Sequence, residues 1–414
     1  MIRKRFLGLT LAAFTALGSA QAGTEIRFDG FPDFDSSLKK ILPEFKKVHP
    51  DIEVKYLMNN WGDHHNKLTT NLATGSGAGD VVVVDVAKIG AFAQSGGLVD
   101  LSTTFNAGQY KDQFPAYAWA QGQDTSGHQF GMPVDLGPGV MYYRNDIAEQ
   151  MGVNINDVIK SWDSYIEYGK KLKEKNIYLI ASAADVAEAI LTTTVEEGNG
   201  IFFDADGKPL LTSPRFIRAF ETAKKIRDLG LDARVSAWTN EWYEGFKSGS
   251  VATQLSGAWL LGHLKNWIAP QTAGKWRVSN LPDGIYGSWG GSFLAIPKQS
   301  AHKKEAWELI KFMTLNQDIQ KLAFRTIAAF PANVNTYDDP MFDEPIEFLG
   351  GQKARRLFAE IAAKVKPVKP AKGDHIARSI VMDNALMEVL DNGRDIREAL
   401  EEAERLLKRR LRTL

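Results

Sequence analysis

Tryptophan is the residue type in this chain with the most suggestive chemistry. Several of the ten tryptophans lie in polar or glycine-rich segments and not in apolar runs. The candidates for ligand contact are Trp61, Trp238, Trp259 and Trp289, the last followed by Gly290 and Gly291. An indole face can lie flat on the C–H face of a sugar ring, and glycines let the backbone approach closely. Because packing in a core explains each tryptophan equally well, the pattern favours a sugar site without establishing one.

Two clusters resemble metal sites, and neither has the required pattern. Asp63-His64-His65 places adjacent histidines on one helix, where they point in different directions and rarely serve one ion. We keep His65 as a residue that can hydrogen-bond a ligand at the edge of a cleft. The segment 204–207 begins like a calcium loop, but Lys208 and Arg215 do not fit the fifth and twelfth positions of such a loop. We therefore expect no metal and no cofactor.

Motifs for catalysis are missing as well. The sequence has no G-x-S-x-G elbow, no H-E-x-x-H and no Gly-Lys-Ser/Thr phosphate loop. The glycine-rich segment 75–79 does not fit G-x-G-x-x-G and precedes a strand, so it is better explained as a turn. A carboxylate pair for glycoside hydrolysis is defined by its spacing in three dimensions, which the sequence does not show. We expect no enzyme, and a carbohydrate-active glycosidase or lyase stays as the alternative.

The N-terminus reads as a secretory leader over residues 1–22. Arg3, Lys4 and Arg5 are followed by an apolar run from Phe6 to Gly18 and by Ala20-Gln21-Ala22, which suits a signal peptidase. The competing explanation, a short membrane anchor or an apolar helix, fits the short run less well. The chain has no cysteine, which excludes disulfides, thiolate metal sites and a lipid-bearing cysteine. We expect a periplasmic protein with a cleaved leader and no lipid anchor.

Charge and length limit the class of partner and the number of lobes. The chain has 50 basic and 50 acidic residues, and loss of the leader removes three basic ones. The resulting weakly acidic protein argues against a nucleic-acid partner, which would need a basic surface. The mature chain is too long for one comfortable core, so two lobes are expected.

Apolar periodicity indicates an α/β protein. Strands are predicted around 26–28, 52–56, 81–84, 140–143, 251–255 and 293–296, and helices at 38–48, 63–74, 162–174, 215–229, 259–268, 303–313 and 396–411. Pro43 predicts a kink or a late start in the first of these helices. The four valines at 81–84 indicate a strand covered on both faces, as in a parallel sheet. Because no linker separates two lobes, the chain must cross between them more than once.

The order of several short segments resembles a known family. The segments are Gly79-Asp80 with 81–85, Ser95 to Leu101, Gly131-Met132-Pro133 with 141–146, Ser161-Trp162-Asp163, Phe246 to Ala252 with Gly257-Ala258-Trp259, and Ala301 to Met313. Each is weak alone, but together and in this order they resemble the extracellular solute-binding proteins of ABC importers, in the maltose-binding-protein-like group for carbohydrate uptake.

The resemblance implies a two-lobe periplasmic binding protein fold, with a mostly parallel sheet flanked by helices in each lobe and a ligand cleft between them. It implies a first lobe of residues 23–134 and 293–331 and a second lobe of residues 135–292 and 332–414. It makes Trp259 the stacking residue, Asp85 and Asp135 acceptors for hydroxyl groups, and Trp289, Gly290 and Gly291 cleft residues. Asp35 would lie in the loop after the first strand. The implied partners are a small carbohydrate and the permease subunits of an inner-membrane ABC transporter, and the protein would be a monomer.

Departures from the family pattern leave the ligand open. Ser250 stands in place of the usual lysine and Thr253-Gln254 in place of an apolar residue, both expected beside the cleft, and Arg144 replaces asparagine. A binder of iron, polyamine or a phosphate-like anion on the same fold is the second alternative. Iron would favour clustered tyrosines, and Tyr142-Tyr143 lie on a strand where one side chain must point away.

Overall fold

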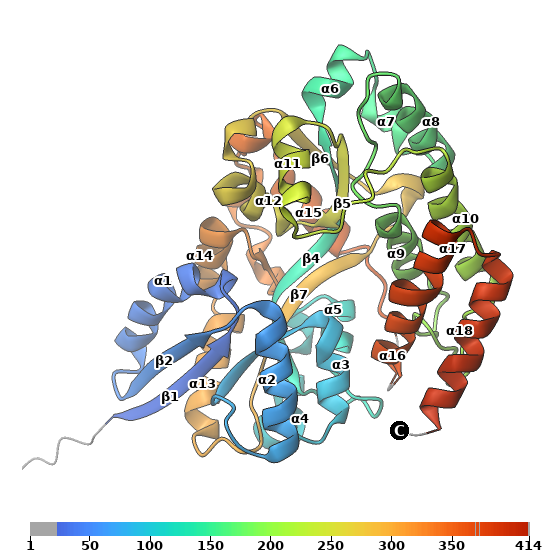
Figure 1. Ribbon diagram of the computed structural model, residues 1–414. Coiled ribbons are helices and arrows are strands. Elements are labelled where there is room, and N and C mark those ends of the chain that lie inside the picture. Colours follow the sequence, from blue (N-terminus) through green and yellow to red (C-terminus); the bar gives the residue numbers. More distant parts are fainter. Residues whose placement is uncertain (1–22, 369, 372, 413–414) are drawn as a thin grey trace, which may run out of the picture.

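The computed structural model describes residues 23–368, 370–371 and 373–412. The predicted leader, 1–22, lies outside these residues. Figure 1 shows two α/β lobes joined by long central strands, which confirms the predicted fold class. Within the described part of the chain, no helix is both long and apolar enough to cross a membrane. The lobe boundaries given above remain a prediction, and we use them to name the first and second lobe.

The first lobe is built on three adjacent strands. β1 (Thr24–Gly30) pairs in parallel with β2 (Ile52–Met58) and with β3 (Val81–Asp85). All four valines of β3 are fully buried. Val81 and Val83 belong to one apolar cluster, whereas Val82 and Val84 face another that includes Phe92. The prediction of a strand covered on both faces is therefore confirmed.

Helices surround this sheet. They are α1 (Asp33–Val48), α2 (Trp61–Thr74), α3 (Val86–Gln94), α4 (Leu101–Phe105), α5 (Ala116–Gln121), α13 (Lys303–Leu315) and α14 (Gln317–Ile327). The late start predicted for the first helix is wrong, since α1 begins at Asp33 and continues through Pro43. The carbonyl that Pro43 leaves free belongs to Lys39, an exposed residue, so water can satisfy it.

Two strands run from one lobe into the other. The first part of β4 (Gly131–Arg144) pairs with β7 (Ser288–Ala295), and its second part pairs with β5 (Thr253–Gly257) and β6 (Trp276–Ser279). The short β8 (Phe330–Pro331) also joins β4. The register between β4 and β7 shifts between Pro133 and Asp135 and again after Leu136. Such irregularities re-aim side chains, and here they flank Asp135.

The prediction of mostly parallel sheets is wrong. Among the named strands of the described chain, the pairs formed by β3 with β7 and by β4 with its four neighbours are antiparallel. The reason is the path of the chain, because β7 returns to the first lobe in the direction opposite to β4. Parallel pairs are formed by β1 with its two neighbours and by the isolated bridges of Tyr178 with Val251 and Ile180 with Asp232.

The second lobe is mainly helical. Its helices before β7 are α6 (Asn145–Gln150), α7 (Ile155–Val158), α8 (Trp162–Lys173), α9 (Ala184–Thr193), α10 (Pro214–Asp228), α11 (Asn240–Ser248) and α12 (Leu260–His263), the last continued by a π turn at 264–268. α8 begins with a capping box formed by Ser161 and Ser164.

The C-terminal helices complete this lobe. They are α15 (Ala354–Ala362), α16 (Asp374–Arg378), a π turn at 379–385, α17 (Leu386–Asn392) and α18 (Ile396–Leu411). α17 and α18 pack on α10, and their apolar side chains join a cluster that includes Tyr165, Phe220 and Leu400. Figure 1 shows the red helices α16, α17 and α18 together at one side of the molecule, with α16 beside α3.

Candidate functional site

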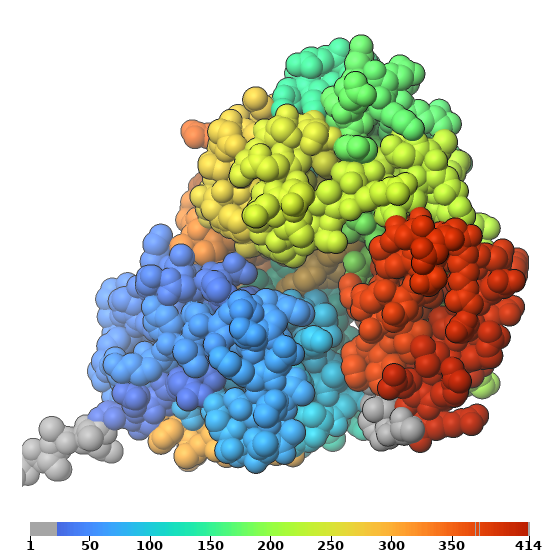
Figure 2. All heavy atoms as spheres, in the orientation of Figure 1, coloured from blue at the N-terminus to red at the C-terminus, as the bar shows by residue number. Residues whose placement is uncertain are grey.

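A cleft of about 1040 Å³ lies where the two lobes and the C-terminal segment meet. Figure 2 shows a hollow between the blue N-terminal part, the yellow-green part and the red C-terminal helices. Its lining comes from the segment that follows β1, from the end of β3, from the crossing strands, and from segments of the second lobe. Eight predicted site residues line it: Trp61, Asp85, Asp135, Trp238, Trp259, Trp289, Gly290 and Gly291. Whether they bind a ligand stays a prediction.

The structure places Asp35 differently from the expectation. It lies inside α1 and not in a loop, because the helix begins directly after Pro32. Its carboxylate pairs with Lys39 at 2.5 Å, and Asp35 is not among the described residues that line the cleft. Asp33, at the start of the same helix, does line it.

His65 is buried behind the cleft wall. Its Nδ1 lies 2.7 Å from the carbonyl oxygen of Trp61, and its Nε2 accepts a hydrogen bond from the backbone N–H of Asp85 at 3.1 Å. Burial lowers the pKa of His65 to about 4, so the ring is neutral. His65 therefore supports Trp61 and Asp85 and is not among the described residues that line the cleft.

Two indoles in the second lobe form what we call the tryptophan platform, defined as Trp238 and Trp259. Their rings lie 5.7 Å apart at an angle of 16°. Trp238 has a φ of +69°, which is strained for a bulky residue, and it remains 49% exposed. The Nε1–H of Trp259 donates to the carbonyl oxygen of Trp289 at 2.6 Å. An exposed, strained and fixed aromatic surface in a cleft is a typical place for ligand stacking.

The glycines beside Trp289 are required by this geometry. Gly290 has a φ of +78° and Gly291 one of +114°, regions that side chains disfavour. A Cβ on Gly290 would lie 2.7 Å from Nε1 of Trp259. The two glycines thus allow β7 to pass directly under the platform.

Two carboxylates face the cleft from the first lobe and the crossing strand. Asp85 ends β3 and caps α3 by accepting from the N–H of Ala87 at 2.8 Å, and burial raises its pKa. Burial also raises the pKa of Asp135 to about 6, an effect that Ser292 on the neighbouring strand partly offsets. Oδ1 of Asp135 is buried and has no hydrogen-bond partner among the described residues. An unpaired buried acceptor of this kind suits a hydroxyl donor from a ligand.

The C-terminal segment supplies a third wall that sequence reasoning missed. Asp374 and Arg378 of α16 line the cleft, and Arg378 pairs with Glu188 of α9 at 2.6 Å. Oδ2 of Asp374 accepts from the N–H of Ala371, its buried Oδ1 has no partner in the described chain, and burial raises its pKa to about 7. No local pattern marks these residues, because their position depends on how α16 packs against α3.

His263 and Trp267 were also missed, although a signal existed. Together with Trp259 they recur at intervals of four, which places them on one face of the helix that continues from α12. Tyr243 lies beside them. By contrast, Ser250, Thr253 and Gln254 were expected beside the cleft and do not line it in the described structure. Thr253 and Gln254 are buried and bond to Tyr165, Trp242 and Asp185.

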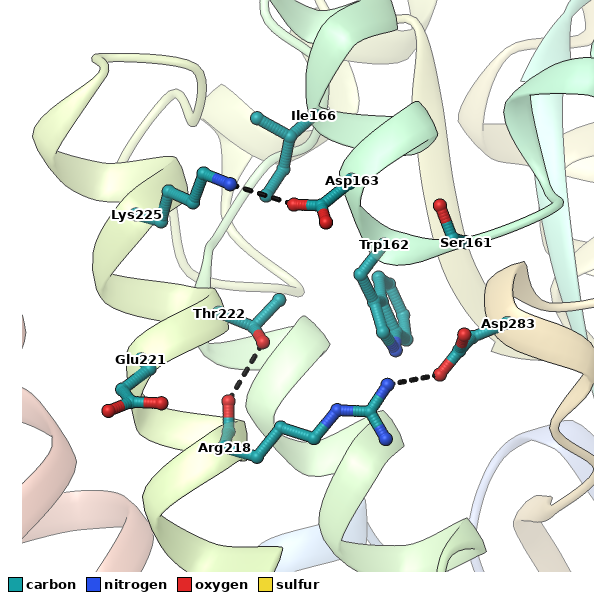
Figure 3. A pocket seen from close by; sticks show the side chains of 9 residues that line it. All are labelled: Ser161, Trp162, Asp163, Ile166, Arg218, Glu221, Thr222, Lys225 and Asp283. Carbon is teal, nitrogen blue, oxygen red and sulfur yellow. Dashed lines mark hydrogen bonds and ion pairs between the residues drawn. The ribbon is translucent and has the colours of Figure 1, made fainter.

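A second hollow of about 320 Å³ lies between α8 and α10 (Figure 3). Lys225 pairs with Asp163 at 2.7 Å across it, and Arg218 pairs with Asp283. Every residue that lines it belongs to the second lobe, so movement between the lobes would leave it unchanged. Four of its five charged side chains already pair with one another, and we do not assign it to a ligand.

The metal alternatives gain no support from the geometry. Within the described ranges no group of three or more His, Asp or Glu side chains is placed to hold an ion. Tyr142, one of the two tyrosines considered above for iron, is fully buried, and its hydroxyl donates to the carbonyl oxygen of Ala258 at 2.9 Å.

Known proteins resemble this chain along most of its length. It is 23% identical over 405 residues to the arabinooligosaccharide-binding protein of Bacillus subtilis (strain 168), covering 92% of this chain and 93% of that one. It is 27% identical over 370 residues to the lactose-binding protein of Rhizobium radiobacter, covering 87% of each. One solved structure, the ABC transporter associated binding protein from B. animalis subsp. lactis Bl-04 in complex with beta-1,6-galactobiose, matches with a TM-score of 0.78 at 26% identity, covering 93% of this chain and 97% of that one.

The family assignment follows from a match that spans most of the chain. The sequence model described as bacterial extracellular solute-binding protein matches residues 40–349, which includes β3, β4, β7 and the tryptophan platform. The chain belongs to the bacterial extracellular solute-binding protein family.

Proposed function

We propose that this protein binds a short carbohydrate in the cleft and delivers it to the permease of an ABC importer, without chemical conversion. The relatives named above bind arabino-oligosaccharide and lactose, and the similar solved structure holds a galactobiose. The single observation that carries the proposal is the placement in one cleft of the tryptophan platform and of an Asp135 oxygen without a hydrogen-bond partner in the described chain. An indole face and a hydroxyl acceptor are the two groups that a sugar ring needs.

Binding would act through closure of the lobes. Asp85 belongs to the first lobe, the tryptophan platform to the second, and Asp135 to the strand that joins them. A ligand that contacts both lobes binds the closed form more tightly than the open form and so shifts the population toward it. The permease would then distinguish loaded from empty protein by shape.

The location of the protein follows from the predicted leader. A cleaved leader and the absence of cysteine in the sequence support a free periplasmic protein. Membership of an extracellular family agrees with secretion. A monomer suffices, because all three walls of the cleft come from one chain.

A thermal-shift screen of the mature protein tests the proposal. The panel contains lactose, beta-1,6-galactobiose, arabino-oligosaccharides and maltose, with citrate, spermidine and ferric citrate for the non-sugar alternative. A sugar at 100 times its Kd stabilises the native state by about 2.7 kcal/mol, which raises the Tm by roughly 3 °C for a chain of this length. A shift with a non-sugar alone would contradict the proposal.

The enzyme alternative is tested on the sugar that gives the shift. Incubation with that sugar, followed by chromatography, should return it unchanged after many hours. A steady appearance of smaller products would make the protein a glycosidase or lyase.

A further inference from the structure

One histidine lies at the centre of the aromatic wall of the cleft. His263 ends α12, and its ring meets three indoles edge-on, with centroids 5.2 Å from Trp238, 5.6 Å from Trp259 and 5.7 Å from Trp267. Its side chain is 15% exposed. His263 therefore sets the position of both rings of the tryptophan platform.

The hydrogen bonds of His263 define its tautomer. The Nε1–H of Trp267 donates to Nδ1 of His263 at 3.1 Å. Because an indole N–H can only donate, Nδ1 must be the acceptor, and the neutral ring carries its proton on Nε2. The proton on Nε2 is thus free to be donated elsewhere.

The atom that faces Nε2 belongs to the other lobe. Oδ1 of Asp33, at the start of α1, lies 4.0 Å from Nε2 of His263. This distance is about 1 Å longer than a hydrogen bond, so a small further approach of the lobes would form one. Both side chains line the cleft, and Asp33 is 53% exposed.

We infer that His263 is a positioning residue that couples the tryptophan platform to closure of the cleft. Trp267 holds the imidazole through Nδ1, the imidazole packs against the platform, and its Nε2–H reaches Asp33 as the first lobe approaches. A sugar stacked on the platform and the hydrogen bond to Asp33 then favour the same closed state. This inference depends on the proposed function, because closure is driven by the sugar.

A double-mutant cycle on the full mature chain tests the coupling. The variants are Asp33→Ala, His263→Asn and the double variant, and calorimetry measures the Kd of the sugar found by the thermal-shift screen. Asparagine places an acceptor near the position of Nδ1 but does not reach Asp33. We expect each single variant to weaken binding about tenfold and the double variant to be no weaker than His263→Asn, since a hydrogen bond to a charged group has this magnitude.

Two further variants exclude a merely structural effect. His263→Gln extends an N–H to the position of Nε2 and should restore most of the affinity lost in His263→Asn. Asp35→Ala removes a carboxylate from the same helix, outside the cleft, and should leave the Kd unchanged.

The pKa of His263 is a measurement that a change in folding stability alone would not alter. Among the described residues, His263 faces the three indole rings and one charged group, the Asp33 carboxylate. Burial lowers the pKa of His263, and the Asp33 carboxylate opposes this lowering. NMR of the sugar-bound protein should show a lower pKa for His263 in Asp33→Ala than in the wild type.

The outcomes separate this inference from the proposed function. Wild-type protein that binds no sugar overturns both. Two results would overturn the coupling alone while the wild type binds sugar normally. One is that the effects of the two single variants add in the double variant. The other is that the pKa of His263 is the same in Asp33→Ala as in the wild type.

Discussion

At the scale of single residues, Asp135 is expected to stabilise the sugar complex and to destabilise the empty protein. Its pKa is raised to about 6, while in an unfolded chain the carboxyl would release its proton near the ordinary value of 3.8. Between these values the folded protein holds the proton and the unfolded chain does not, so stability falls as the pH rises from about 4 to about 6. Asp135→Asn removes this dependence and should be more stable at pH 8 by roughly 1–3 kcal/mol.

The same substitution should weaken sugar binding. A hydroxyl donor favours the charged carboxylate, so the affinity of the wild type should rise as the pH passes through 6, and that of Asp135→Asn should not. Urea unfolding and calorimetry at pH 5 and pH 8 measure both effects, with Asp35→Asn as the control outside the cleft. An Asp135→Asn protein that is less stable at pH 8, with unchanged affinity, would show that Asp135 is only a structural residue.

Substitution of Trp259 is expected to cause the largest loss of sugar affinity. Trp259→Ala removes half of the tryptophan platform and should raise the Kd roughly 100-fold, as for tryptophans at binding hot spots, while the chain stays folded. Tyr178→Ala is the control, because Tyr178 is an exposed aromatic residue of the second lobe that is not among the described residues of the cleft. Equal affinity of Trp259→Ala and the wild type would place the sugar elsewhere.

At the scale of elements, strand β7 positions the platform through Gly290. Gly290→Ala adds backbone strain and a clash with Trp259, whereas Gly207→Ala adds only strain, because Gly207 has a φ of +82° and no described atom would lie within 4 Å of the new Cβ. We expect both variants to lose about 1–2 kcal/mol of stability and only Gly290→Ala to lose sugar affinity. Equal affinities in calorimetry would show that β7 does not control the platform.

Local signals predicted most elements but not their pairing. The buried strand of four valines, β3, is a pattern of neighbours in sequence, and its prediction is confirmed. The antiparallel partners of β4 depend on the path of the whole chain, which periodicity does not encode. Eight of the ten candidate site residues lie at the cleft. The wall formed by α16 was missed, because its position also depends on the path of the whole chain.

At the scale of the whole molecule, the arrangement of β4 and β7 predicts a motion between lobes and little change within them. The two strands pass from one lobe to the other with register shifts at Asp135 and after Leu136. A few residues of this kind can absorb a hinge rotation. Hydrogen exchange should therefore slow on sugar binding at segments that line the cleft, including 238–267 and 374–382, and not at the hollow lined by Trp162 and Arg218.

Small-angle scattering of the wild type and Trp259→Ala, with and without the sugar identified by the screen, tests the central claim most directly. We predict that the radius of gyration of the wild type falls and saturates at one sugar per chain, and that Trp259→Ala shows no change at the same sugar concentration. Identical wild-type profiles at a sugar concentration where calorimetry shows full occupancy would contradict the closing cleft.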